Sequence, residues 1–451
     1  MAYSHDISGT TVKKISLTPP QILVFGFAVI IALGSILLTL PGFTVPGKRT
    51  DLLTALFTAT SAVCVTGLVV VDTGTHWSLA GQILILLLIQ VGGLGFMTMA
   101  MVFFILMGKR IGLKNRLIVK ESLNQMNAAG IVSLVKMILL FTLVTELLAA
   151  LVLGVWWAGE MGPAKGAWFG LFHSVTAFNN AGFDLFGEFR SLAGYRGDPV
   201  VNMVITSLII IGGLGFSVVY DLWKNGYKKK MSVHTRMVIT VTILLLVIGV
   251  VLFAALEWNS ALKGLPLQEK IMASYFQGVT PRTAGFNTVD MTVLRPTSLL
   301  VIIVLMFIGA SPGSTGGGIK TTTFSLLILA SGSISSGKED IEIYNRRIPF
   351  HQVYKALTIF LLATFWVILA VMVLSITEKA DFLTLLFEIV SAMGTVGLTL
   401  GITPELSETG RVIIMLTMFL GRLGPMTVAF ALAQKGKVSK IRYPEEKIIV
   451  G

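Results

Sequence analysis

The windows that decide the fold are SAVCVTGL (Ser61 to Leu68), TAFNNAGF (Thr176 to Phe183), VTPRTAGF (Val279 to Phe286) and SAMGTVGL (Ser391 to Leu398). Each of these glycine windows holds a glycine at the same offset, and an aromatic residue stands ten positions before it. The glycines are Gly67, Gly182, Gly285 and Gly397, and the aromatics are Phe57, Phe172, Tyr275 and Phe387. Successive glycines are separated by 115, 103 and 112 residues. A repeat of this length, inside a membrane protein, indicates one structural unit used four times around an axis.

The composition places the chain in a lipid bilayer. Hydrophobic residues make up 54% of the 451 residues and charged residues only 13%, with a mean hydropathy of +0.83. A soluble domain carries about a quarter charged residues. The net charge of +12 gathers in the N-terminal tail, in 108–130, 224–236 and 337–355, and in the C-terminal tail. This asymmetry predicts that both termini are cytoplasmic and accounts for the basic excess without a nucleic-acid partner.

Eight stretches are long and apolar enough to cross a hydrocarbon core of about 30 Å. They are 21–41, 78–107, 131–157, 199–222, 235–256, 297–330, 353–376 and 411–433. Between the members of each pair lies a stretch of half that length, namely 51–60, 166–177, 269–279 and 382–392. We expect these to be re-entrant half-helices. The predicted fold is therefore all-α and integral to the membrane, with four helix–pore-loop–helix repeats around a pseudo-fourfold axis.

The glycine windows have the chemistry of an ion filter. A dehydrated cation needs rings of oxygen atoms in place of its water shell, and backbone carbonyls supply them in potassium channels. Glycine allows φ > 0, which lets carbonyls of a tight loop turn toward an axis. Because the four windows share no polar side chain, main-chain coordination is expected. The candidate residues are Val65, Thr66, Gly67, Asn180, Ala181, Gly182, Thr283, Ala284, Gly285, Thr395, Val396 and Gly397.

Charged residues lie beside and within the windows. Asp72, Asp184 and Asp290 follow three of the windows, where they either attract cations to a pore mouth or are ordinary loop acids. Arg282 lies inside the third window, where a cation path does not suit it. We expect its side chain to turn behind the filter and pair with an acid, Glu388 or Glu269.

The second long helix of each repeat carries glycines of its own. Residues 92–96 and 212–216 both spell GGLGF, and the corresponding residues spell GASPG at 309–313 and GRLGP at 421–425. Small residues here indicate either close helix packing or a bend beneath the filter, and both can hold together.

Repeat three breaks its second helix. Residues 309–320, GASPGSTGGGIK, are too rich in glycine to hold an α-helix and contain a proline. The segment is not a nucleotide-binding P-loop, because Ile319 separates Gly318 from Lys320 and no strand precedes it. We expect Lys320 to extend toward the cytoplasmic surface. Arg422, in the matching part of repeat four, is an intramembrane charge of the kind that usually marks function.

The fourfold glycine repeat, the basic loops and the break in repeat three resemble the Trk/Ktr/HKT superfamily of potassium transporters, and within it the bacterial Ktr membrane subunit. The resemblance implies a potassium-selective filter at the four glycines, with K+ as the transported ion. It also implies that the break is an intramembrane gating loop and that Arg422 is an electrostatic barrier; the alternative for Arg422 is a helix-packing ion pair. The candidate gate residues are Gly309, Ser311, Pro312, Gly313, Gly316, Gly317, Gly318 and Arg422.

The resemblance further implies a homodimer in a bacterial cell membrane, seated on a cytosolic ring of nucleotide-binding regulatory subunits. ATP or ADP would bind that partner, and this chain is expected to carry no cofactor. The chain is not expected to be an enzyme, because its five histidines are scattered and form no metal-spacing motif. A Na+- or H+-coupled potassium symporter is the alternative, with Glu146 and Glu388 as the available coupling carboxylates. Stimulation by Na+ stays open.

The expected domain organisation follows the repeats. A cytoplasmic tail, 1–19, precedes repeat 1 (20–110, pore loop 51–68) and repeat 2 (111–230, pore loop 166–183). Repeat 3 spans 231–340 with pore loop 269–286 and gating loop 309–320. Repeat 4 spans 341–433 with pore loop 382–398, and residues 434–451 are expected to form a second cytoplasmic tail.

Overall fold

The computed structural model describes residues 18–47, 49–95, 98, 131–225, 231–432, 444 and 446, and most of these residues are helical. Its α-helices in the first two repeats are α1 (Pro19–Leu38), α2 (Leu52–Cys64), α3 (Thr73–His76), α4 (Leu79–Leu94), α7 (Ile131–Met161), α8 (Pro163–Phe178), α9 (Pro199–Leu214) and α10 (Phe216–Asn225). Those in the last two are α11 (Val233–Glu257), α12 (Leu267–Val279), α13 (Pro296–Phe307), α14 (Thr321–Ser335), α15 (Phe350–Thr377), α16 (Phe382–Gly394), α17 (Glu408–Leu423) and α18 (Pro425–Leu432). Four 3-10 turns lie at Pro41–Phe43, Ala193–Tyr195, Met291–Val293 and Thr403–Glu405.

Short helices, α2, α8, α12 and α16, lie at the four stretches where half-helices are expected, and they are called half-helices below. Carboxylate caps fix where two of them begin: Asp51 accepts from the backbone N of Thr54 at 3.0 Å, and Asp381 accepts from that of Thr384 at 3.1 Å. Such caps satisfy N–H groups that a helix start leaves free. Proline starts α8 and precedes α12, where its missing N–H costs nothing.

Helices occupy the described part of all eight expected spans, but four spans are interrupted: α4 ends at Leu94, inside the span 78–107, and three others are bent or split. By length and composition, α1, α7, α11 and α15 can each cross a membrane, and up to six spans result if each bent pair is one. The pair α9–α10 bends by 90° and the pair α17–α18 by 96°. The stretch 297–330 is split into α13 and α14 by residues 308–320. The second half of the expected span 78–107 lies outside the described residues, apart from residue 98.

Close packing of the half-helices explains the glycines and aromatics of each repeat. The side chains of Phe57, Phe172 and Phe387 are fully buried. Tyr275, in the third repeat, is half-buried and its hydroxyl accepts from Thr206 at 3.2 Å. Where α8 lies along α7, a Cβ on Gly170 would be 2.5 Å from the backbone N of Gly154, so only glycine allows this approach.

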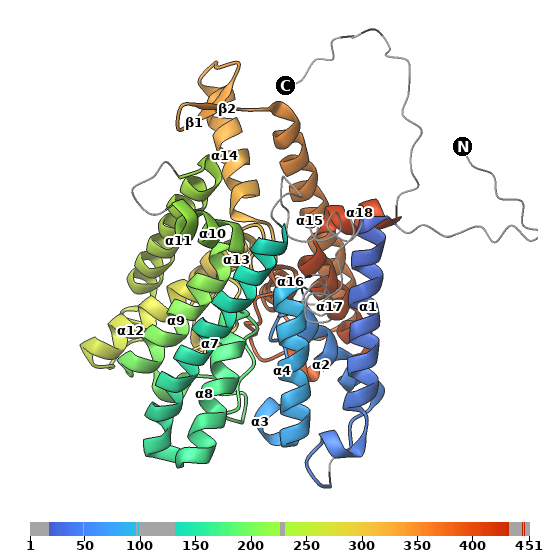
Figure 1. Cartoon of the computed structure of the whole chain (residues 1–451), viewed down its shortest axis with the longest axis vertical. Coiled ribbons are helices and arrows are strands. Elements are labelled where there is room, and N and C mark those ends of the chain that lie inside the picture. Colours follow the sequence, from blue (N-terminus) through green and yellow to red (C-terminus); the bar gives the residue numbers. More distant parts are fainter. Residues whose placement is uncertain are drawn as a thin grey trace, which may run out of the picture.

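A hairpin that the sequence did not lead us to expect lies between α14 and α15. Strands β1 (Ile341–Ile343) and β2 (Arg346–Ile348) pair antiparallel, with Ile341 opposite Ile348. Their two-residue turn, Tyr344 and Asn345, has φ of 50° and 60°. Figure 1 shows this hairpin projecting from the end of the molecule where α1 begins and α18 ends. Those two helices are joined there by Gln21, whose Nε2 donates to the carbonyl of Ala431 at 3.1 Å.

Candidate functional site: a ring of four glycines

The four glycine windows share one backbone conformation. At the end of each half-helix, a residue that is not glycine adopts a left-handed φ: 59° at Val65, 58° at Asn180, 64° at Thr283 and 48° at Thr395. Two positions later the repeated glycine is also left-handed, with φ of 91° at Gly67, 69° at Gly182, 78° at Gly285 and 92° at Gly397. A left-handed residue that is not glycine costs about 1–3 kcal/mol and persists only where its surroundings impose it. Four such residues at one offset indicate a single loop design used four times.

The four glycines lie together in a closed ring. A Cβ on Gly67 would meet the carbonyl oxygen of Ala181 at 2.5 Å; one on Gly182 would meet that of Ala284 at 2.8 Å. A Cβ on Gly285 would meet the oxygen of Val396 at 2.6 Å, and one on Gly397 would press on that of Thr66. Each glycine therefore faces the carbonyl that precedes the glycine of the next repeat, and repeat four returns to repeat one.

Backbone bonds tie each window to its own half-helix. The backbone N atoms of Thr66, Ala181, Ala284 and Val396 donate to carbonyls four or five residues earlier, at 2.8–3.0 Å. In repeats one and four the ring glycine is held as well, because Ser61 Oγ accepts from Gly67 N and Ser391 Oγ accepts from Gly397 N, both at 3.1 Å. The structure thus brings all twelve candidate filter residues together around one centre, and the nearest neighbours of the ring glycines are backbone atoms.

The glycines of the second helices serve both packing and bending. A Cβ on Gly92, Gly212 or Gly421 would collide with the carbonyl of the residue four before the ring glycine of its own repeat. Just beyond these contacts, Gly95, Gly215 and Gly424 end their helices with φ of 79°, 94° and 84°. Close packing is therefore confirmed for these three glycines, and bends of 90° and 96° are found at Gly215 and Gly424.

In repeat three, the glycine-rich loop (residues 309–318) takes the place of such a bend and lies against three of the windows. Thr315 Oγ1 donates to the Asn180 side-chain oxygen at 2.6 Å. A Cβ on Gly316 would collide with the hydroxyl of Thr283, and one on Gly317 would collide with that of Thr395. The loop therefore contacts the left-handed residues of repeats two, three and four. Thr315 was absent from our candidate residues; its place between glycines in this segment was the available signal.

Hydrogen bonds join the glycine-rich loop to the helix bends on either side. Its Ser311 and Thr315 donate backbone N–H groups to Gly213 and Gly212, at 3.1 and 3.2 Å. On the same side, Phe216 N donates to Gly313 O at 2.9 Å, and a Cβ on Gly215 would lie 2.6 Å from Pro312 O. On the other side, Gly318 N donates to Gly421 O at 3.3 Å. Within the loop, Gly309 packs against Gly317.

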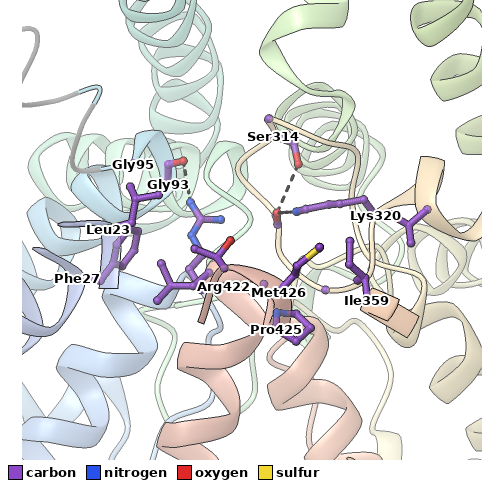
Figure 2. Close-up of a pocket in the computed structure, with 18 of the residues that line it drawn as sticks. Leu23, Phe27, Gly93, Gly95, Ser314, Lys320, Ile359, Arg422, Pro425 and Met426 are labelled. Carbon is purple, nitrogen blue, oxygen red and sulfur yellow. Dashed lines mark hydrogen bonds between the residues drawn. The ribbon is translucent and has the colours of Figure 1, made fainter. Parts of the chain in front are cut away.

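The side chains of Arg422 and Lys320 donate hydrogen bonds to carbonyls of the glycine-rich loop. The guanidinium of Arg422 donates to the carbonyls of Thr315, Gly92 and Gly93, and so connects the loop to the end of α4. Figure 2 shows the bond to Gly93. Lys320 Nζ donates to Gly316 O at 2.7 Å and Gly317 O at 3.4 Å. Lys320 therefore folds back onto the loop, and our expectation that it extends to the surface is wrong. Both side chains line a cavity of about 180 Å³ beneath the loop.

The partner expected for Arg282 is also wrong. Arg282 is 6% exposed and donates to the carbonyl of Ile308, at the end of α13. The ion pairs found among the described residues are Arg190 with Glu188 and Arg347 with Asp340, so neither Glu388 nor Glu269 pairs with Arg282. The physical reason is that the unwound end of a helix offers an unused carbonyl, which solvates a guanidinium without a second buried charge. The helix-packing ion pair considered for Arg422 is likewise absent from these pairs.

The acids that follow the windows stabilise turns. Asp72 accepts from Thr75 N at 2.9 Å and caps α3; it also accepts from Phe189 N at 2.9 Å. Asp184 accepts from Phe186 N at 3.1 Å, and Asp290 accepts from Thr292 N at 2.9 Å. Each carboxylate thus accepts from a backbone N–H two or three residues ahead, as an ordinary loop acid does, and Asp72 adds a bond to repeat two.

Comparison with known proteins places this geometry in a family. The family model described as TrkH, cation transport protein, matches residues 18–441. The chain is 45% identical to Ktr system potassium uptake protein B of Bacillus subtilis over 98% of both chains. It is 42% identical to potassium/sodium uptake protein NtpJ of Enterococcus hirae, covering 96% of this chain and 98% of that relative. The crystal structure of the potassium transporter TrkH from Vibrio parahaemolyticus matches with a TM-score of 0.72 and 20% identity, over 94% of this chain and 86% of the other, and supports the fold.

Proposed function

The chain belongs to the TrkH family of cation transport proteins, which are ion transporters and not enzymes, and from this premise we propose that it is the K+-selective, ion-translocating subunit of a bacterial uptake system. The observation that carries the proposal is the closed ring of Gly67, Gly182, Gly285 and Gly397. Its neighbours are backbone carbonyls from four repeats, which is the oxygen-ring chemistry that replaces the water shell of K+. The names of the relatives, a potassium uptake protein and a potassium/sodium uptake protein, favour the same ion.

The glycine-rich loop is the proposed gate. Its contacts with three windows support a position directly under the filter, and its flexible composition suits two backbone arrangements of similar free energy. Arg422 would act there in two ways. Its positive charge repels a cation that leaves the filter, and its bonds to Thr315, Gly92 and Gly93 hold the loop in place.

We further propose eight crossings and four re-entrant half-helices, divided into the four repeats as expected from the sequence. The bends at Gly215 and Gly424 support this division, because they fall at equivalent places in repeats two and four. The start of α1, the end of α18 and the hairpin would face the cytoplasm, in agreement with the basic residues nearby.

Partners are proposed from the relatives. The name "Ktr system" implies further subunits for the B. subtilis protein. We propose that this chain likewise forms a homodimer and docks on a cytosolic ring that binds ATP or ADP. The name of the E. hirae relative supports stimulation or transport of Na+ as an additional property.

A coupled symporter remains the second candidate because two buried carboxyl groups lie beside the windows. Glu388 accepts from Thr399 and Thr403. Glu146 accepts from Gln90 at 3.3 Å and from Asn179, the neighbour of Asn180, at 2.9 Å. Neither carboxyl has a cationic partner among the ion pairs of the described residues, and such groups are typical of coupling sites.

Flux measurements on the purified full chain in liposomes test both candidates. We expect K+ to move down its own electrochemical gradient, in the absence of Na+ and of a pH gradient, faster than in protein-free liposomes. K+ movement that requires an imposed Na+ or H+ gradient would instead establish the symporter. K+ flux no greater than that of Na+ under any gradient would overturn the K+-selective function.

A further inference from the structure

Buried polar side chains on three of the half-helices hold the chain segment that leaves the glycine ring. In repeat four this residue is Glu388, which is fully buried and nine positions before Gly397. Its carboxylate accepts from Thr399 Oγ1 at 2.8 Å and from the buried hydroxyl of Thr403. The two hydroxyls also lie 3.0 Å apart. The carboxylate therefore binds both ends of a short loop that begins two residues after the ring glycine.

Repeat two makes the same connection with a different side chain. His173, nine positions before Gly182, is fully buried. Its Nδ1 lies 2.8 Å from the carbonyl of Phe169, which assigns the proton to Nδ1 and leaves Nε2 as an acceptor. Leu185 N, three residues after Gly182, donates to that Nε2 at 3.4 Å.

Repeat three uses the next position along its half-helix. The side-chain amide of Gln277 is 1% exposed, and the two N–H groups that face it assign which end is the oxygen. With the oxygen on that side, it accepts from Thr288 N at 3.3 Å and from Val289 N at 3.2 Å. These residues are three and four positions after Gly285. The side chains differ in chemistry but share one connection, from the half-helix to the segment after the glycine.

Repeat one departs from this pattern. The residue equivalent to Glu388 is Thr58, whose hydroxyl donates to Thr54 O of its own helix at 3.0 Å. Among the described hydrogen bonds, no side chain of α2 reaches the segment that follows Gly67, although Ser61 holds Gly67 itself. In three of the four repeats, a side chain of the half-helix is thus hydrogen-bonded to the segment that follows the ring glycine.

We propose that Glu388, His173 and Gln277 are positioning residues that set the width of the filter and so its K+ selectivity. This inference rests on the proposed filter function. A ring of carbonyls discriminates between ions only if its oxygens keep their spacing when a smaller ion enters. Each anchor fixes the segment that follows a ring glycine to a buried half-helix, much as outer residues orient the ligands of a metal site. Glu388 contributes most, because it binds two hydroxyls of one segment and its bonds are shorter than those of the other two anchors.

The test compares K+ and Na+ flux in liposomes for the full chain and its variants. Glu388→Ala removes the acceptor of both hydroxyl bonds and is expected to lower the K+/Na+ flux ratio by about tenfold, the combined effect of losing two buried hydrogen bonds. Glu388→Gln keeps one acceptor oxygen and is expected to recover most of the ratio. Thr403→Val removes one hydroxyl and is expected to lower the ratio less than Glu388→Ala does. It also keeps the test open if the alanine variant fails to fold.

Glu257 provides the matched control. It too is a fully buried glutamate, and it accepts from Arg295 N at 2.9 Å and from Ala261 N at 3.2 Å, away from the glycine windows. Glu257→Ala is expected to lower thermal stability and to leave the K+/Na+ ratio unchanged. Unchanged ratios in folded Glu388→Ala and Thr403→Val would overturn the inference alone. A lack of K+ selectivity in the unaltered chain would overturn the proposed filter, and the inference with it.

Discussion

Gly397→Ala is expected to reduce K+ flux about 100-fold and to abolish selectivity for K+ over Na+. A Cβ at this position would press on the carbonyl oxygen of Thr66 and lie 3.1 Å from the Cα of Gly67, and backbone atoms cannot rotate away as side chains do. The φ of 92° adds about 1–2 kcal/mol of strain for an alanine. A total penalty of about 3 kcal/mol corresponds to roughly 100-fold in an equilibrium such as ion binding. Flux of the purified variant in liposomes measures the effect.

Gly264→Ala separates backbone strain from the contact within the ring. Gly264 lies between α11 and α12 with φ of 81°, and no atom comes within 4 Å of a Cβ built there. The strain in the two variants is therefore similar, whereas only Gly397→Ala introduces a collision between repeats. We expect Gly264→Ala to conduct like the unaltered chain. Equal losses in the two variants would show that the ring contact does not determine flux.

The sequence predicted the ring because its signal is periodic. A glycine at one offset in four repeats, each after a stretch too short to span the bilayer, leaves few arrangements other than convergence on an axis. The break in repeat three was equally evident from its composition, since glycine and proline at that density exclude a helix. Gly316 and Gly317, named as gate residues because of the family resemblance, lie against Thr283 and Thr395 in the structure.

The sequence could not predict hydrogen bonds from charged side chains to backbone carbonyls. We expected an acid for Arg282, but its guanidinium meets the carbonyl of Ile308, and every residue type has a carbonyl. Lys320 is a similar case, because it bonds to carbonyls of the loop that precedes it. Hydrogen bonds between side chains at the two sides of a loop could not be predicted either, for a different reason. Glu388 was noticed as a buried carboxylate, but its partner Thr403 lies fifteen residues later, and only the folded loop brings them together.

The asymmetry of the four repeats suggests where gating and selectivity are separated. The ring glycines and the left-handed residues before them repeat in all four units. Below the ring, within the described ranges, repeat three inserts a loop and repeat four offers the arginine that holds it. Because the loop touches windows of three repeats at once, we propose that a single movement of the loop opens or closes the path without altering the ring.

Deleting Ser314, Thr315 and Gly316 from the glycine-rich loop is expected to raise K+ flux severalfold while preserving selectivity. The deletion removes the hydroxyl that bonds to Asn180 and the carbonyl that Arg422 holds. Arg422→Ala should act in the same direction, since it releases Thr315 from Gly92 and Gly93. A bond from a charged donor contributes about 1.5–3 kcal/mol. The loss of one such bond from the closed arrangement shifts the open population about tenfold or more.

Arg411→Ala is the matched control for the arginine, because Arg411 lies on the same helix, α17, and also binds backbone carbonyls. It donates to Leu406 O at 3.1 Å and to Pro404 O at 3.3 Å, and none of its described bonds reaches the glycine-rich loop. We expect its replacement not to raise K+ flux. A general leak would admit Na+ as readily as K+, so flux of both ions distinguishes an open gate from a damaged pore. If the folded deletion variant and Arg422→Ala both conduct K+ like the unaltered chain, the loop does not obstruct the path, and the closing element must lie elsewhere along it.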